Sequence, residues 1–228
     1  KGNPLLMQRQ LVENYQTRID WNTTPTMEAD IFETSSIYDA LNRPKLTILP
    51  DNTRLVPTYN EGAYLENLSA QIMGRGNWID FLKGQDYDAK GQRQYVKYGN
   101  SVITKFFYDA KTFRLNNLLT THSNDTLQNL EYTYDPIGNI MQVKDKAQNT
   151  FFYQNQSVHP LKKYEYDALY RLKKASGREH SGANAPTNQD LAHLSNVPNT
   201  NIASAVRAYT QTYEYDKAGN ILQMQHQA

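Results

Sequence analysis

The sequence predicts an all-β fold made of tandem, twisted antiparallel β-hairpins. The first observation behind this prediction is internal repetition, because a Tyr followed by Asp or Asn recurs seven times in 228 residues. The second is alternation, since Tyr132 and Tyr134 of one copy fall on the same face of a pleated strand. The third is the turn-forming residues directly after the dipeptide. The seven dipeptides are Tyr38-Asp39, Tyr59-Asn60, Tyr87-Asp88, Tyr108-Asp109, Tyr134-Asp135, Tyr166-Asp167 and Tyr215-Asp216.

Residues 1–36 precede the first motif and are predicted to be a lead-in segment. Leu5, Leu6 and Leu11 contribute to an approximate helical stripe over residues 4–18. We therefore expect either a short helix or an irregular segment there.

Residues 37–228 are predicted to form one continuous hairpin array, because no linker rich in Pro, Gly or Ser divides the repeats. In each copy the strand runs up to the motif Tyr. The Asp or Asn side chain can then bond to the backbone two residues on and open a turn. Gly138-Asn139 and Gly219-Asn220 supply the positive φ of a tight turn, and Arg171 takes the Asn position in its copy. The returning strands are expected over 140–143, 172–175 and 221–224.

Residues 176–206 interrupt the array and are predicted to form a long surface loop. They lack strand alternation and contain clusters of Gly, Pro, Asn and Ser. A helical turn at 188–194 is left open within this loop. The last strand is not followed by the polar, atypical repeat expected at the end of a complete array, so we expect a part of a longer array.

The composition limits the kind of core that the chain can build. Hydrophobic residues make up 39% of the sequence and include 17 Tyr, so burial shifts from aliphatic side chains to amphipathic rings. The net charge of +1, without a long charge run, argues against a nucleic-acid partner. No stretch approaches the about 20 apolar residues of a membrane-spanning helix. The absence of Cys excludes disulfides and cysteine metal ligands.

The motifs resemble those of the YD-repeat, or Rhs-repeat, family of bacterial proteins. The resemblance runs from about Tyr38 to the end of the chain. It is carried by Tyr-Asp-x-x-Gly-Asn-Ile at 134–140 and 215–221, and by the related copies at 38–44, 87–93 and 166–172. The chain is most similar to the Rhs-containing region of insecticidal toxin complex B or C components. In that family the hairpins spiral into a hollow shell, so the resemblance implies that this chain is part of such a shell.

The resemblance also implies a function without catalysis. The chain would be a structural segment of a shell that encapsulates a toxin or effector polypeptide for delivery, in a protein that is secreted or held at the bacterial surface. The implied partners are the remainder of the shell, a partner toxin-complex component and the enclosed polypeptide. The alternative is a cell-surface module in which exposed Tyr side chains bind glycan or protein. Rings packed from strand to strand would favour the shell, and a row of solvent-facing rings would favour recognition.

The sequence supports structural roles for the motif aspartates and the histidines better than catalytic or metal-binding roles. The motif aspartates occupy equivalent positions of successive turns, so they are expected to be spread along a sheet edge instead of forming an acid–base or calcium site. The segment 135–138 is similar to the Asp-Pro-x-Gly element of Rhs proteins that cut themselves, but the ordinary repeat ending Asn139-Ile140 follows it. The triplet 178–180 is interpreted as a structural anchor. The histidines His122, His159, His180, His193 and His226 lack zinc-site spacing.

We therefore predict no catalytic, cofactor-binding or metal-binding residue and assign the motif residues to the turns. These residues are Tyr38, Asp39, Tyr59, Asn60, Tyr87, Asp88, Tyr108, Asp109, Tyr134, Asp135, Gly138, Asn139, Tyr166, Asp167, Arg171, Tyr215, Asp216, Gly219 and Asn220.

Overall fold

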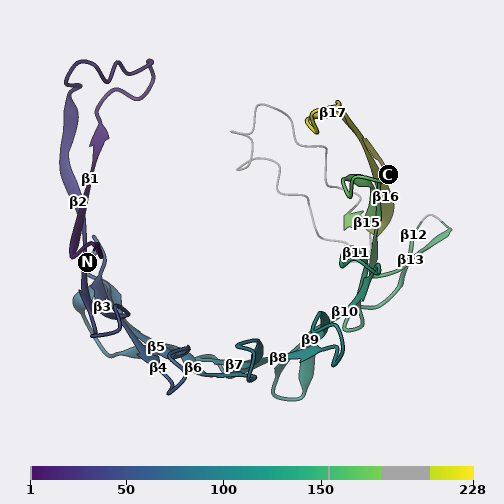
Figure 1. The fold of residues 1–228 in the computed structure, drawn as a ribbon, viewed down its shortest axis with the longest axis horizontal. Coiled ribbons are helices and arrows are strands. Elements are labelled where there is room, and N and C mark those ends of the chain that lie inside the picture. The colour runs from purple at the N-terminus through teal and green to yellow at the C-terminus, as the bar shows by residue number, and fades with distance from the viewer. Residues whose placement is uncertain (1, 154, 181–205) are drawn as a thin grey trace. The chain divides into compact units, whose positions relative to one another are not determined.

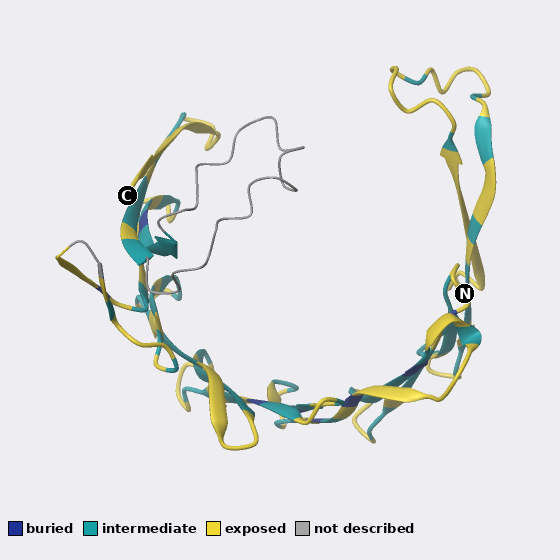
Figure 2. Ribbon diagram, turned by 180° about the vertical axis from the view of Figure 1, so that it is seen from behind, coloured by how far each residue is buried: buried dark blue, intermediate teal, exposed yellow. Residues whose placement is uncertain are grey.

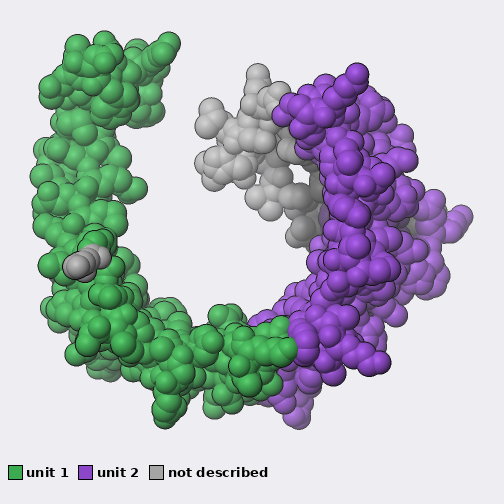
Figure 3. Space-filling view, viewed as in Figure 1, with its two compact units in different colours: residues 1–103 green, residues 104–228 purple. Residues whose placement is uncertain are grey.

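A computed structural model of the chain describes residues 2–153, 155–180 and 206–228 (Figure 1). These residues divide into two compact units, unit 1 with residues 1–103 and unit 2 with residues 104–228 (Figure 3). In both units, strands that follow one another along the chain pair with each other in antiparallel ladders. The predicted all-β fold of tandem antiparallel hairpins is confirmed.

Unit 1 contains seven strands in the order β1 to β7. They are β1 (Leu6–Val12), β2 (Met27–Tyr38), β3 (Pro44–Ile48), β4 (Arg54–Tyr59), β5 (Leu65–Gln71), β6 (Ile79–Tyr87) and β7 (Arg93–Tyr98), with the 3-10 turn η1 (Ile72–Gly74) after β5. The next strand, β8 (Val102–Tyr108), begins in unit 1 and ends in unit 2.

Unit 2 continues with strands in the order β8, β9, β10, β11, β14, β15, β16 and β17. Two short strands, β12 and β13, form a separate two-stranded sheet between β11 and β14 in the sequence. The bounds are β9 (Leu115–His122), β10 (Asp125–Tyr134), β11 (Ile140–Asp145), β12 (Phe151–Tyr153), β13 (Gln156–Val158), β14 (Leu161–Tyr166), β15 (Leu172–His180), β16 (Val206–Tyr215) and β17 (Ile221–Gln227).

The lead-in segment was expected to be either a short helix or irregular over residues 4–18; the helix is wrong, because strand β1 occupies Leu6–Val12, and the residues directly after it have no regular secondary structure. Strand β1 pairs antiparallel with β2, with Leu6 opposite Ser35. A single short helix needs a surface on which to bury its apolar face, whereas strand pairing satisfies the backbone directly. Strand β2 also runs through the predicted boundary between residues 36 and 37 and pairs with β3 on its other side.

The predicted loop 176–206 is shorter at both ends than expected. Strand β15 continues to His180, β16 begins at Val206, and these two residues pair with each other. This pairing of β15 with β16 could not be predicted from the sequence, because the two strands lack an alternation of apolar residues. They are held by backbone hydrogen bonds and by polar side chains. Residues 181–205, with the helical turn considered at 188–194 and His193, lie outside the described residues.

The core is thin in both units. Ala70, Leu82 and Val96 are buried in unit 1, and Val158 and Ala175 in unit 2. No large side chain among the described residues is completely buried. Figure 2 accordingly shows mainly half-buried and exposed ribbon, with few buried segments. The paired strands must therefore be stabilised by their backbone hydrogen bonds and by half-buried polar and aromatic side chains, as the composition indicated.

Candidate functional site

The motif turns close around the Asp carboxylate. In the first hairpin, Oδ1 of Asp39 accepts hydrogen bonds from the backbone N–H groups of Leu41 and Arg43, at 2.8 and 2.9 Å. The backbone closes the same turn, because Asp39 N donates to Arg43 O at 2.9 Å. The carboxylate thus satisfies amides that a tight turn leaves without a backbone partner. The same arrangement recurs at Asp88, Asp167 and Asp216, and with small changes at Asp109 and Asp135.

One residue of each turn has a positive φ, and only some of these residues are Gly. Gly138 and Gly219 have φ of 114° and 94°, outside the left-handed helical region that other residues can enter. Asn42 and Tyr170, which precede an Arg, have φ of 62° and 63°, inside that region. This difference explains why the repeats tolerate different turn sequences. Ala63 and Gly91 take the same position in two other copies, and in the copy of Asp109 the positive φ falls one residue later, at Phe113.

In four turns the residue after the positive-φ position binds the second carboxylate oxygen. Arg43 and Arg171 place Nε 2.7 Å from Oδ2 of Asp39 and Asp167, respectively. In the Gly-containing turns an amide replaces the guanidinium, since Asn139 Nδ2 donates to Asp135 Oδ2 at 2.8 Å. Asn220 does the same for Asp216, also at 2.8 Å. Arg and Asn are therefore alternative partners for one carboxylate.

The contacts at Asp39, Asp135 and Asp167 favour the charged form of the carboxylate. The backbone N–H of Arg43 is the main cause that lowers the pKa of Asp39 below its ordinary value, followed by the guanidinium of the same residue. The corresponding groups of Arg171 lower the pKa of Asp167. Desolvation acts to raise the pKa of Asp135, but hydrogen bonds from Asn139 and Gly138 outweigh it and the pKa is lowered. A carboxylate in this state is a poor proton donor at neutral pH.

Five of the seven motif tyrosines each link their hairpin to the preceding one. In unit 1, the hydroxyl group of Tyr59 donates to Pro44 O at 3.0 Å. Pro44 is the first residue of the strand that returns from the previous turn. The acceptor occupies this same position for Tyr87 in unit 1, with Leu65 O at 3.1 Å, and for three tyrosines of unit 2. These are Tyr134 with Leu115 O at 2.7 Å, Tyr166 with Ile140 O at 2.9 Å and Tyr215 with Leu172 O at 2.7 Å.

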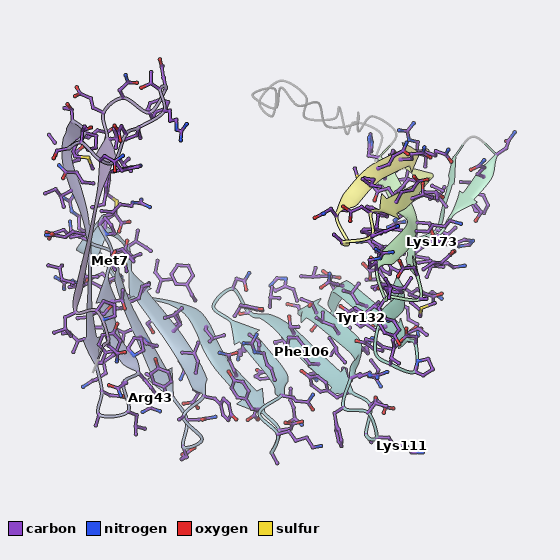
Figure 4. All side chains as sticks on the ribbon, turned by 45° about the horizontal axis from the view of Figure 1, so that its top comes forward. Met7, Arg43, Phe106, Lys111, Tyr132 and Lys173 are labelled. Atoms are coloured by element: carbon purple, nitrogen blue, oxygen red, sulfur yellow. The ribbon has the colours of Figure 1, made fainter. Side chains whose placement is uncertain are left out.

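A side chain from the preceding turn covers the motif ring. In unit 1 the guanidinium of Arg43 lies 4.4 Å from the ring centre of Tyr59, and the ring of Tyr64 stacks on Tyr87 at 4.6 Å. In unit 2 the guanidinium of Arg171 lies 4.7 Å from the ring centre of Tyr215. Figure 4 labels Arg43, which lies at the turn end of its hairpin.

Two arginines of unit 2 also bind the backbone of the next turn. Arg171 Nη1 donates to Asp216 O at 3.1 Å. Arg114 donates to Asp135 O and Pro136 O at 2.8 and 3.1 Å, and its guanidinium lies 5.8 Å from the ring centre of Tyr134. We call the linked motif tyrosines and their covering side chains the turn ladder. It comprises Arg43, Tyr59, Tyr64 and Tyr87 in unit 1, and Arg114, Tyr134, Tyr166, Arg171 and Tyr215 in unit 2.

Sequence reasoning identified the motif tyrosines and Arg171 but missed Arg43, Tyr64 and Arg114 as site residues. Their common signal is position, since each stands five or six residues after a motif Tyr. The missed feature is that such a residue serves two hairpins, closing its own turn and covering the next ring. Spacing within one repeat gives no information on contacts between repeats.

The turn ladder brings turn backbones and tyrosine rings together. It does not bring together acidic, basic or nucleophilic side chains in the way that a catalytic site does. Each motif Asp bonds within its own turn, and the described residues contain no group of three or more His, Asp or Glu that could hold a metal ion. His159 lies between Thr150 and Ser157, whereas His226 contacts Glu179. No helix in the described part of the chain is long and apolar enough to cross a membrane.

Comparisons with known proteins agree with this architecture. No protein-family model matches the chain. It is 32% identical over its whole length to toxin subunit YenC2 of Yersinia entomophaga, and 34% identical over 71% of its length to toxin subunit YenC1 of the same organism. It spans 25% and 18% of these two relatives.

Solved structures give the same result. The crystal structure of TcdB2-TccC3 matches 98% of the chain with a TM-score of 0.76 at 29% identity, and the chain covers 11% of that structure's chain. The Photorhabdus luminescens Tc holotoxin pore matches 97% of the chain with a TM-score of 0.73 at 29% identity, and 10% of its own chain is covered.

Proposed function

Because the chain belongs to the Rhs/YD-repeat region of toxin complex B and C components, we propose that it is a non-enzymatic wall segment of a shell that encapsulates a toxin or effector polypeptide. The chain spans about a quarter or less of the toxin subunits that it matches. The enclosed polypeptide, the remainder of the shell and a partner toxin-complex component would be supplied by other parts of the assembly. The assembly would act outside the bacterium that makes it or at its surface.

The turn ladder is the observation that carries this proposal. A wall between two wet compartments cannot rely on a thick apolar layer, and neighbouring hairpins must still hold together. In this chain the hydroxyl group of one hairpin binds the backbone of the preceding hairpin, as Tyr166 does with Ile140 O. The ring is covered by a side chain of an earlier turn, as Arg171 covers Tyr215. These links recur at five of the seven motifs, which suits a wall.

The state of the tyrosines favours a wall over glycan recognition. Glycan-binding aromatic residues expose a ring face to solvent. Here the motif rings are half-buried, and Tyr59 and Tyr134 each have one side taken by an Arg guanidinium. Burial raises the pKa of both phenols, as expected for rings packed among neighbours. The same contacts leave little free surface for a sugar.

The experiment that tests the proposal uses the toxin subunit that carries this chain, with its enclosed polypeptide. Tyr134 and Tyr166 are replaced together by Ala, and limited proteolysis measures how fast the enclosed polypeptide is digested. We expect protection in the unmodified subunit and faster digestion in the variant, because two links between hairpins are lost. Replacement of Tyr15, which is 79% exposed, by Ala is the matched control.

Two outcomes would contradict the proposal. If the polypeptide is digested equally fast with and without the unmodified shell segment, the chain does not contain it. If glycan binding is found and is abolished by Tyr134→Ala while protection is unchanged, the chain is a recognition module.

A further inference from the structure

Three motif turns carry an exposed aliphatic side chain at the same position, two residues after the motif Asp. The position is occupied by Leu41 in unit 1 and by Ile137 and Leu169 in unit 2, and these residues are 65%, 54% and 69% exposed. The other four copies have Gly, Lys or Ala there. Leu and Ile are among the residues most often buried, so their exposure at equivalent turn tips requires an explanation.

The turn fixes the direction of these side chains. The backbone N–H of Leu41 donates to Asp39 Oδ1, and that of Leu169 donates to Asp167 Oδ1, both at 2.8 Å. The backbone is thus tied to the carboxylate inside the turn, and the side chain is left outside it. Lys111 has the same position after its motif Asp, and Figure 4 shows it at the turn end of its hairpin. The tip side chains therefore extend the hairpins along the strand direction.

Tyr170 adds an aromatic ring to this edge of unit 2. It directly follows Leu169, is exposed, and has a φ of 63°. A bulky residue at positive φ is a conformational outlier, whereas Gly138 takes the corresponding position of another turn without a side chain to strain. Backbone strain is typically retained where the strained residue has a function. An exposed ring held in this way is expected to have a use outside its own turn.

Neighbouring turns of unit 2 are held to one another. Arg114 donates to two carbonyl oxygens of the turn 135–139, and Arg171 donates to one of the turn 216–220. The hairpins that carry Ile137 and Leu169 are joined by the pairing of β11 with β14. The tips are thus preorganised, which lowers the entropic cost of a contact with a partner. We call the apolar tip residues of unit 2 the turn-tip strip; they are Ile137, Leu169 and Tyr170.

We propose that the turn-tip strip is the surface on which this wall segment contacts another row of hairpins of the same toxin subunit, and that Leu41 has the same role in unit 1. The inference rests on the proposed wall function and deepens it. An enclosed polypeptide meets a face of the sheet, whereas the turn tips meet whatever continues the wall along the strand direction. The chain spans a quarter or less of the toxin subunits that it matches, so other segments of the subunit would form most of the wall.

The partner surface is expected to be apolar, like the opposite ends of the hairpins in unit 1. There the loop 72–78 between β5 and β6 exposes Ile72, Met73 and Trp78. Met73 also has a positive φ, 52°. A wall segment with a neighbouring row on each side needs apolar contacts at both ends of its hairpins, and unit 1 has them. Burial of aliphatic and aromatic side chains against such an edge is favourable because apolar area is removed from water on both surfaces.

Cysteine labelling in the intact toxin subunit that carries this chain tests the proposal. The chain contains no Cys, so Ile137→Cys and Leu169→Cys each introduce a single thiol into it, whose reaction with a maleimide is followed by mass spectrometry of the labelled peptide. We expect both tips to react about tenfold or more slowly in the folded subunit than in the urea-unfolded one, because reaction requires local opening of the contact.

Thr133→Cys and Lys162→Cys are the matched controls. Both residues are exposed, and they project from opposite faces of the sheet, because Thr133 pairs with Gln142 and Lys162 pairs with the adjacent Val143. These thiols should react in the folded subunit nearly as fast as in the unfolded one. Tip thiols that react as fast as these controls would overturn the proposal.

A photoreactive phenylalanine analogue in place of Leu169 identifies the occupant. We expect crosslinks to strands or loops of the same subunit outside this chain. Crosslinks to the enclosed polypeptide, to a second copy of the subunit or to another protein would overturn the proposal.

Digestion of the enclosed polypeptide separates this inference from the proposed function. If the tips are protected and crosslink to the subunit while the polypeptide is freely digested, the contact is correct and containment is wrong. If the polypeptide is protected while the tips react as fast as the controls, containment is correct and the contact is wrong.

Discussion

The hydroxyl group of Tyr215 donates a hydrogen bond to the carbonyl oxygen of Leu172, 2.7 Å away. Tyr215 ends the outgoing strand of the last hairpin, and Leu172 begins the returning strand of the hairpin before it. In four other repeats the carbonyl oxygen of the first residue of the returning strand accepts a hydrogen bond from the motif tyrosine of the next hairpin. These tyrosines are Tyr59, Tyr87, Tyr134 and Tyr166. The Tyr of the repeat is therefore a link between hairpins, and the Asp that follows it closes the turn.

Removal of one hydroxyl group tests the value of this link. Tyr166→Phe keeps the ring but removes the donor to Ile140 O, so we expect a loss of about 0.5–1.5 kcal/mol in the free energy of unfolding, measured by urea denaturation. Tyr170→Phe is the control, because that side chain is 60% exposed. Equal stability of the two variants would show that the hydroxyl link contributes nothing.

Replacement of Arg171 by Lys tests whether the shape of the guanidinium matters. Lys keeps the charge but cannot at once bind Asp167, donate to Asp216 O and cover the ring of Tyr215. We expect a loss of about 1–2 kcal/mol in the free energy of unfolding. Arg75→Lys, at an exposed loop position, should have no measurable effect. An Arg171→Lys chain as stable as the original would reduce the contact to simple charge attraction.

The positive φ of Tyr170 predicts a stabilising substitution. A non-Gly residue at φ of 63° is strained, and Gly relieves that strain although it gains freedom in the unfolded chain. We expect Tyr170→Gly to raise the thermal midpoint slightly, with a net gain of about 0.5–1 kcal/mol. Leu169→Gly, one residue earlier and without positive φ, should be destabilising. If both substitutions lower the midpoint equally, local strain does not control this turn.

The motif carboxylates predict a loss of stability in acid. The pKa of Asp39, Asp109, Asp135, Asp167 and Asp216 is lowered from the ordinary value of 3.8 in the folded chain. Between the folded and the unfolded pKa the unfolded chain binds more protons, so this stabilisation is complete above the ordinary value and is lost as the pH falls through the folded one.

Urea midpoints measured from about pH 6 to about pH 3 test this sign. The midpoint should fall below about pH 4, and Asp167→Asn should make the fall shallower because one of the shifted groups is gone. A fall that is equally steep in this variant would assign acid sensitivity to other carboxylates.

The parts of the fold that follow from neighbouring residues could be predicted from the sequence. Asp167 and Arg171 are four positions apart, so the closed turn follows from local chemistry alone. The lead-in was predicted less well, because Leu5, Leu6 and Leu11 fit a helical stripe as well as a strand. The choice between helix and strand depended on pairing with β2, whose residues lie from 15 positions (Val12 with Met27) to 29 positions (Leu6 with Ser35) along the chain from their partners in β1. The two ends of the predicted loop 176–206 were missed for the same reason, because His180 and Val206 pair across the segment between them.

The sequence by itself determined the hairpin unit and its turn, because both depend on contacts within a few residues. Only the tertiary structure decided which atoms join one hairpin to the next. Tyr215 and Leu172 are 43 residues apart, and Tyr134 and Leu115 are 19 apart, so repeat spacing alone could not identify the acceptor. The acceptor is set by the register of paired strands, which is a property of the whole ladder. The motif Tyr is recognisable in the sequence, and its function as a link requires the fold.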